Sequence, residues 1–342
     1  MLPFILIAVV AAAVPTILYT LIIWWLDRYE KEPLHLLVAT FVWGALPAIL
    51  LAIFFEILLE APTAQSPLGP TAVTWALAPL VEEPVKALAL IALFMFARRE
   101  FDGILDGIVY GALIGFGFAM TENLLFFLND PTDLNGQFWL RSVVFGFNHA
   151  LFTSIVGLAL GAVRYAPQRW LGYVALSAGM VLAILLHGLH NIAVNYQLLG
   201  MAFAWVVQWS GVVTLLAITG LAWNHEHTWI KQELGEEITL GTISATDYAE
   251  VLFASRRTRA HLRALAQHGL PCYLRVRQLH HLMIELAFCK YQLRVGDRFQ
   301  HHDERERLRR AIIVLRADLS GSGELPGQAE CVVWNEGTRK SE

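Results

Sequence analysis

The sequence predicts an all-α, polytopic membrane protein with about seven transmembrane helices and a helical cytoplasmic C-terminal tail. Hydrophobic residues make up 56% of the 342 residues, and the mean hydropathy is +0.51, which is too apolar for an ordinary soluble chain of this length. Lys and Arg are unevenly spread, with 8 of the 25 in residues 1–224 and the other 17 in residues 225–342. We therefore expect a membrane domain over 1–224 and a polar tail over 225–342.

Seven apolar runs are each long enough to cross about 30 Å of hydrocarbon, which takes roughly 20 helical residues. They lie at residues 4–26, 35–59, 72–97, 105–128, 141–163, 171–195 and 201–223. Pro15 and Pro47 fall inside runs, where they are expected to bend a helix rather than end it. Glycines recur at helical spacing in the fourth and fifth runs, which predicts close packing of those helices, at positions 107, 111, 115, 157 and 161.

The charge of the connecting segments predicts the orientation. Lys and Arg follow the first, third and fifth runs, whereas residues 60–71, 129–140 and 196–200 contain none. By the positive-inside rule, the N-terminus lies outside the cell membrane and the tail is cytoplasmic. Arg141, at the outer end of the fifth run, is the exception.

The tail is expected to form helices near 246–266, 272–294 and 302–318, separated at Gly269 to Pro271 and at Gly296. Its last twenty or so residues are polar and rich in glycine, so we expect disorder there. The basic residues of the tail alternate with leucine, isoleucine and acids and form no recognised nucleic-acid motif. No nucleic-acid partner is therefore expected, and the sequence leaves the oligomeric state open.

Ionisable side chains within the apolar runs are the strongest functional signal, because they are costly in hydrocarbon and usually functional. Four consecutive runs contain such polar residues: Glu82, Glu83 and Lys86; Glu122 and Asn123; His149; and His187, His190 and Asn191. At 1.5 Å per residue, the predicted topology places the acids and His149 and His187 roughly 9 to 15 Å below the outer surface. These side chains can therefore meet at one site.

The residue types indicate hydrolysis. Glutamates and histidines are ligands of catalytic zinc, which takes about three protein ligands and leaves a position for water. A further carboxylate can then act as general base, with Lys86 as a counter-ion for the acids. His190 is expected to be structural, and Glu56 is expected to reach the membrane interface.

Two other classes fit part of this pattern. A membrane lipid or ceramide-type amidohydrolase would use a three-histidine site with Asp and Ser, whereas this chain offers a pair of glutamates. A transporter with an intramembrane Glu/His relay would spread polar residues across the whole depth of the membrane. Here the inner halves of the runs are almost purely apolar.

Four motifs in order resemble the PrsW family of membrane proteases, over most of residues 27–195. They are Glu82-Glu83-Pro84-Val85-Lys86, Phe118-Ala119-Met120-Thr121-Glu122-Asn123, His149-Ala150-Leu151-Phe152-Thr153 and His187-Gly188-Leu189-His190-Asn191. The segment from Asp27 to Pro33 also resembles the family's first cytoplasmic loop. The wider group includes the CAAX prenyl endopeptidases and bacteriocin-processing membrane proteases.

The resemblance implies an intramembrane protease that cuts membrane-anchored proteins, such as anti-sigma factors, near the outer face. One of Glu82 and Glu83 would activate water, and His187 with Asn191 would bind the scissile carbonyl or the oxyanion. Glu122 stands where CAAX endopeptidases have histidine. The resemblance therefore leaves two possibilities: Zn²⁺ held by Glu122, His149 and His187, or a metal-independent glutamate peptidase.

Overall fold

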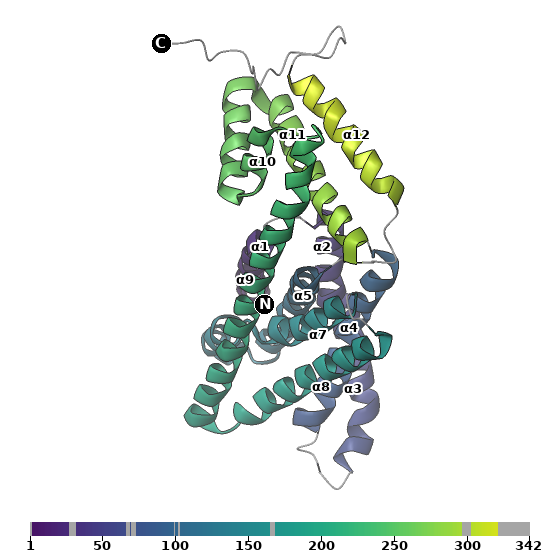
Figure 1. Cartoon of the computed structure of the whole chain (residues 1–342). Helices are drawn as coiled ribbons and strands as arrows, with labels where there is room; N and C mark the ends of the chain where they lie inside the picture. The colour runs from purple at the N-terminus through teal and green to yellow at the C-terminus, as the bar shows by residue number, and fades with distance from the viewer. Residues whose placement is uncertain are drawn as a thin grey trace. The chain divides into compact units, whose positions relative to one another are not determined.

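The computed structural model describes residues 2–26, 32–65, 69, 73–98, 100–101, 103–164, 168–295 and 302–320, and these residues are mostly helical and contain no strand. The α-helices (Figure 1) are α1 (Leu2–Leu26), α2 (Leu34–Trp43), α3 (Ile49–Ala64), α4 (Ala78–Phe96), α5 (Ile104–Asn129), α6 (Leu134–Gln137), α7 (Asn148–Arg164), α8 (Arg169–Ala193), α9 (Gln197–Thr239), α10 (Ala245–Val251), α11 (Ala254–Val295) and α12 (His302–Leu319). The all-α prediction is confirmed.

Six helical segments of the described chain are long and apolar enough to cross a membrane. They correspond to six of the seven predicted runs. The remaining run contains α4, whose Glu82, Glu83 and Lys86 raise its charge above that of an ordinary span. All three side chains are buried in the protein, at 5%, 0% and 0% exposure, so α4 presents its charges to neighbouring helices rather than to lipid.

Both predicted proline positions lie within continuous helical segments. Pro15 lies inside α1, and Pro47 lies in a π-helical turn, Gly44–Ala48, which joins α2 to α3. A wider helical turn relieves the clash that proline makes with the preceding carbonyl, so the chain stays helical through the position.

The centre of the membrane unit is the packing of α5 against α7, and of α7 against α8. A Cβ atom on Gly107 would lie 2.0 Å from the carbonyl oxygen of Gly157, and one on Gly115 would lie 2.3 Å from that of His149. Only glycine permits this approach of two backbones. The glycines predicted to pack closely thus set the position of His149 against α5.

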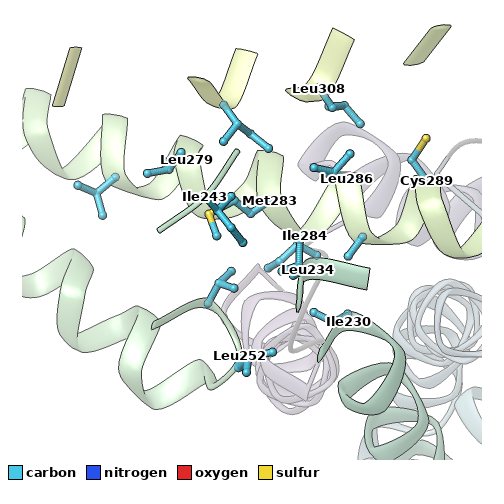
Figure 2. Packing of buried hydrophobic residues seen from close by; sticks show 14 of the residues in the cluster. Ile230, Leu234, Ile243, Leu252, Leu279, Met283, Ile284, Leu286, Cys289 and Leu308 are labelled. Carbon is cyan, nitrogen blue, oxygen red and sulfur yellow. The ribbon is translucent and has the colours of Figure 1, made fainter. Parts of the chain in front are cut away.

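The contacts divide the described chain into two compact units, one ending at Ala222 and one beginning at Trp223. The second unit has its own core, built from α9 through α12 (Figure 2), in which Ile230, Leu234, Met283 and Ile312 are fully buried. A hydrophobic core of this kind is what an independently packed helical unit requires.

The tail helices differ in part from the prediction. The last membrane helix, α9, does not end near residue 223 but continues to Thr239. The helix expected over 246–266 is split, because α10 ends at Val251 and α11 begins at Ala254. The expected interruption at Gly269 is present, with φ of 77°. Gly296 and the expected disordered end lie outside the described residues.

Candidate active site

The site begins on α4, where the carboxylates of Glu82 and Glu83 both turn towards Lys86. The Nζ atom of Lys86 donates to Glu82 Oε2 at 2.9 Å and to Glu83 Oε1 at 2.8 Å. Helical spacing explains this, since residues three and four positions apart lie on one face. Lys86 Nζ also lies 3.8 Å above the centre of the Phe118 ring of α5, a cation–π contact. The predicted counter-ion role of Lys86 matches this geometry.

Histidines from α7 and α8 complete the cluster. His149 Nδ1 is 3.0 Å from Lys86 Nζ and 3.9 Å from Glu82 Oε2. His187 Nδ1 is 2.9 Å from Glu83 Oε1. The two imidazole rings lie 5.2 Å apart and nearly perpendicular, at 88°. Three helices distant in sequence therefore direct their ionisable groups to one point.

These groups form a candidate metal centre. Among the described residues, one ligand atom from each of Glu82, Glu83, His149 and His187 falls within 4.8 Å of all the others. Imidazole nitrogen and carboxylate oxygen are the donors that zinc takes in catalytic sites. Glu83 Oε2 is buried and has no hydrogen-bond partner among the described residues, which leaves one oxygen available. The donor set fits a divalent metal such as zinc.

Glu122 lies beside this group rather than within it. Its Oε2 atom is 3.0 Å from His149 Nε2 and accepts a hydrogen bond from Arg141 Nη2 at 2.7 Å. Arg141 Nε also donates to Asn123 Oδ1 at 3.1 Å. Glu122 therefore contacts the ring nitrogen of His149 that faces away from the cluster, which is the usual arrangement for a carboxylate that orients a metal-binding imidazole.

Arg141 is the site residue that the sequence analysis missed. The positive-inside pattern singled it out as an exception, and its guanidinium forms an ion pair with Glu122. An arginine at the outer end of one span, opposite a carboxylate in the preceding span, was the signal that could have identified the pair.

The remaining predicted residues occupy separate places. Asn191 lies one turn after His187 on α8, and its backbone carbonyl accepts a hydrogen bond from Asn195 at 2.6 Å. His190 is bonded to Asn148, at 2.9 Å between Nε2 and Nδ2. Glu56 on α3 has a buried Oε1 atom with no hydrogen-bond partner among the described residues. This oxygen is shielded by the protein, and the interfacial position of the side chain stays a prediction.

The fold and the site together define a class: a polytopic membrane enzyme that keeps a cluster of glutamates and histidines between its spans. The profile described as PrsW family intramembrane metalloprotease matches residues 32–219. This match covers more than half of the chain, and the protein belongs to the PrsW family. It is accordingly a membrane-embedded, multi-pass peptidase with a protein substrate.

Curated relatives agree with this assignment. Protease PrsW of Geobacillus kaustophilus (strain HTA426) is 32% identical over 165 residues, which cover 48% of this chain and 69% of the relative. Protease PrsW of Clostridioides difficile (strain 630) is 28% identical over 166 residues, covering 48% and 69%. Protease PrsW of Bacillus subtilis (strain 168) is 27% identical over 197 residues, covering 54% and 84%. No solved structure matches significantly. The family favours the protease over the amidohydrolase and transporter alternatives.

Proposed function

We propose that this PrsW-family member is a metal-dependent endopeptidase, in which a glutamate-activated water cleaves a peptide bond of a membrane-anchored protein. The observation that supports the proposal is the buried group of two glutamates and two histidines, whose ligand atoms all lie within 4.8 Å of one another. Such a concentration of ionisable groups within a membrane domain is costly unless it binds a cation or acts on a substrate.

The directions of the side chains support a role for each residue of the cluster. We assign His149 Nδ1, His187 and one carboxylate of the Glu82–Glu83 pair as the three zinc ligands. The other glutamate of the pair then takes the proton of the attacking water and delivers it to the leaving amine. A bound zinc ion would polarise the scissile carbonyl and acidify the water. Glu122 orients His149 through Nε2 in this proposal, which revises its expected role as a ligand.

Lys86 supplies the positive charge of the cluster when no metal is bound. Its ammonium is within 3.0 Å of both glutamates and of His149 Nδ1. An ammonium and a divalent metal attract the same oxygen atoms, so they compete for them. We infer that metal binding displaces the Lys86 ammonium from at least one carboxylate.

We assign Asn191 a role in binding the substrate. It lies four residues after His187 and therefore on the same face of α8. An amide donor in this position can hydrogen-bond the oxyanion that develops on the scissile carbonyl, a contribution often worth about 3 kcal/mol.

We further propose that residues 1–224 form the catalytic domain and that residues 225–342 form a cytoplasmic tail. Its support is the alternating charge of the connecting segments. With the N-terminus outside, the site lies in the outer half of the membrane. Membrane-anchored anti-sigma factors cut near the outer face are then the proposed substrate class.

The test separates ligand from base by measuring two quantities on each variant. Purified Glu82→Gln and Glu83→Gln proteins are assayed for zinc content by mass spectrometry and for cleavage of a membrane-anchored substrate peptide. The base variant is expected to retain zinc and to lose activity by about 10²-fold or more, whereas the ligand variant loses both.

Glu60→Gln, at an exposed position of α3, is the matched control and should keep zinc and activity. Full activity in both site variants would refute the mechanism. If the wild-type protein is active without zinc and either site variant loses that activity, the enzyme is a metal-independent glutamate peptidase instead.

A further inference from the structure

A second polar site lies beside the glutamate–histidine cluster. A small pocket, with room of about 10 Å³ for the centre of a water molecule, opens between α7, α8 and α9. Most of its lining is aliphatic or aromatic, including Leu151, Phe152 and Ala204, but Asn148, His190 and Gln208 also line it. Polar groups in such a pocket need partners that its apolar walls cannot provide.

The polar side chains expose a defined set of hydrogen-bonding atoms. Asn148 Oδ1, His190 Nδ1 and Gln208 Oε1 are buried and have no hydrogen-bond partner among the described residues. Asn148 and Gln208 are only 5% and 3% exposed. Each buried polar atom left unpaired costs about 1 to 3 kcal/mol, so three such atoms on side chains that line one pocket favour a bound partner.

The neighbouring bonds determine which atoms donate. Asn148 Nδ2 contacts His190 Nε2 at 2.9 Å; because an amide nitrogen can only donate, Nε2 accepts and the ring proton is on Nδ1. Gln208 Nε2 donates to the carbonyl of Val144 at 3.1 Å, which leaves its Oε1 as an acceptor. The pocket residues thus offer two acceptors and one donor.

One water molecule matches this set. Its two protons can be donated to Asn148 Oδ1 and Gln208 Oε1, while a lone pair accepts from His190 Nδ1–H. A buried water requires roughly 10 to 15 Å³ of such space and two to four polar partners. The size of the pocket meets the lower end of this range.

The position of the pocket connects it to catalysis. Phe152 lines the pocket and also stacks on His187, with ring centres 5.1 Å apart and planes 17° apart. Asn148 immediately precedes His149 on the chain. A hydrolase in the hydrocarbon region must obtain water where the surroundings hold almost none.

We propose that Asn148, His190 and Gln208 form a water-binding site that supplies the hydrolytic water to the glutamate–histidine cluster, past the edge of Phe152. This inference rests on the proposed hydrolytic function. It assigns His190 a ligand, whereas the sequence predicted only a structural role. It also assigns a role to Gln208, which belongs to none of the four motifs.

The experiment combines radiolytic labelling with kinetics on the full-length protein in detergent. After rapid mixing into H₂¹⁸O, a brief X-ray pulse oxidises side chains next to bound water, and retained ¹⁶O identifies slowly exchanging water. In the wild-type protein, Phe152 and His190 should be oxidised with retained ¹⁶O, which is the label of slowly exchanging water. Gln208→Leu, which removes one acceptor, and Ala204→Val, which fills space without touching a polar atom, should both lose it.

The same two variants should lower kcat about tenfold with unchanged KM and zinc content, because each weakens the hold on a single water. Ser210→Ala is the control, since its exposed hydroxyl donates a hydrogen bond to the carbonyl of Val206 on its own helix; it should keep both label and kcat. Absence of slowly exchanging label in the wild type overturns the water site. Loss of label with unchanged kcat in both variants overturns the supply role.

The labelling arm also separates this inference from the proposed function. Glu83→Gln should keep the label while losing proteolysis. Label in wild type together with full activity of both Glu82→Gln and Glu83→Gln would contradict the mechanism but leave the water site standing. An active wild-type protein without label would contradict the water site but leave the proposed mechanism standing.

Discussion

Two buried lysines, one in each unit, form nearly the same ion pair with a buried glutamate, but the other partners of that glutamate differ. Lys86 in the membrane unit bonds Glu83 at 2.8 Å, and Lys290 in the tail bonds Glu237 at 2.8 Å. Both glutamates are fully buried, at 0% exposure. A buried ion pair of this kind is poor evidence for function by itself, because its desolvation cost offsets much of the attraction.

The next partner distinguishes the two pairs. Both oxygens of Glu237 bind the guanidinium of Arg309, at 2.7 and 3.0 Å. Glu83 instead contacts His187, and its Oε2 atom has no partner among the described residues. Arginine stays charged and cannot bind a metal, so both oxygens of Glu237 are already occupied. Histidine is a metal ligand and a proton carrier, so our proposal lets the membrane cluster exchange its cation.

Removing each lysine should give the largest difference between the clusters. In the presence of a chelator, Lys86→Met and Lys290→Met should each lower the free energy of unfolding by about 3 to 5 kcal/mol, because each leaves buried carboxylates uncompensated. Added zinc should restore Lys86→Met, since the metal replaces the missing charge, but not Lys290→Met. Thermal unfolding in detergent with and without zinc measures both effects. Equal rescue of the two variants, or of neither, would show that the two clusters do not differ in their response to zinc.

An intermediate effect is expected where Glu122 holds His149. Glu122→Gln should weaken zinc binding by about 10- to 100-fold, the usual consequence of losing a carboxylate that orients a ligating imidazole. Competition with a chromophoric chelator measures the affinity. Glu236→Gln in the tail is the matched control, because its side chain is 70% exposed and contacts no histidine cluster. Unchanged affinity in Glu122→Gln would mean that His149 is positioned without it.

The smallest expected effect is a loss of stability of the tail unit when the pH falls below neutral. Burial lowers the pKa of His280 to about 3, and burial followed by Arg257 lowers the pKa of His261 to about 4. The rings contact each other at 3.0 Å. Since both pKa values lie below that of unfolded histidine, about 6.5, stability is complete above pH 6.5 and falls as the pH drops towards 4.

At pH 5.5 the loss should be about 1 kcal/mol for each histidine. Circular dichroism melts of the whole protein between pH 7.5 and 5 measure it. His280→Gln should flatten this dependence, and the wild-type slope persisting in that variant would assign the acid sensitivity to other groups.

The sequence predicted the helices of the membrane unit well because hydrocarbon leaves few choices. A run of about 20 apolar residues has to become a helix to satisfy its own backbone, and α1, α5 and α8 lie close to their expected bounds. The packing role of the glycines was equally predictable, since residues such as Gly107 and Gly157 commonly allow two membrane helices to approach closely. The predicted end of the last membrane helix, near residue 223, was wrong, because charged residues end a membrane span without ending the helix. The helix α9 continues to Thr239.

By itself the sequence determined the all-helical membrane fold, the four polar spans and the family, since hydropathy, spacing and motif order are properties of the chain. Only the tertiary structure decided which groups meet. The rotation of each helix about its axis places Glu82 and Glu83 with the two histidines, and pairs Glu122 with Arg141. That rotation is set by side-chain packing among helices far apart in sequence, and no periodicity within one helix specifies it.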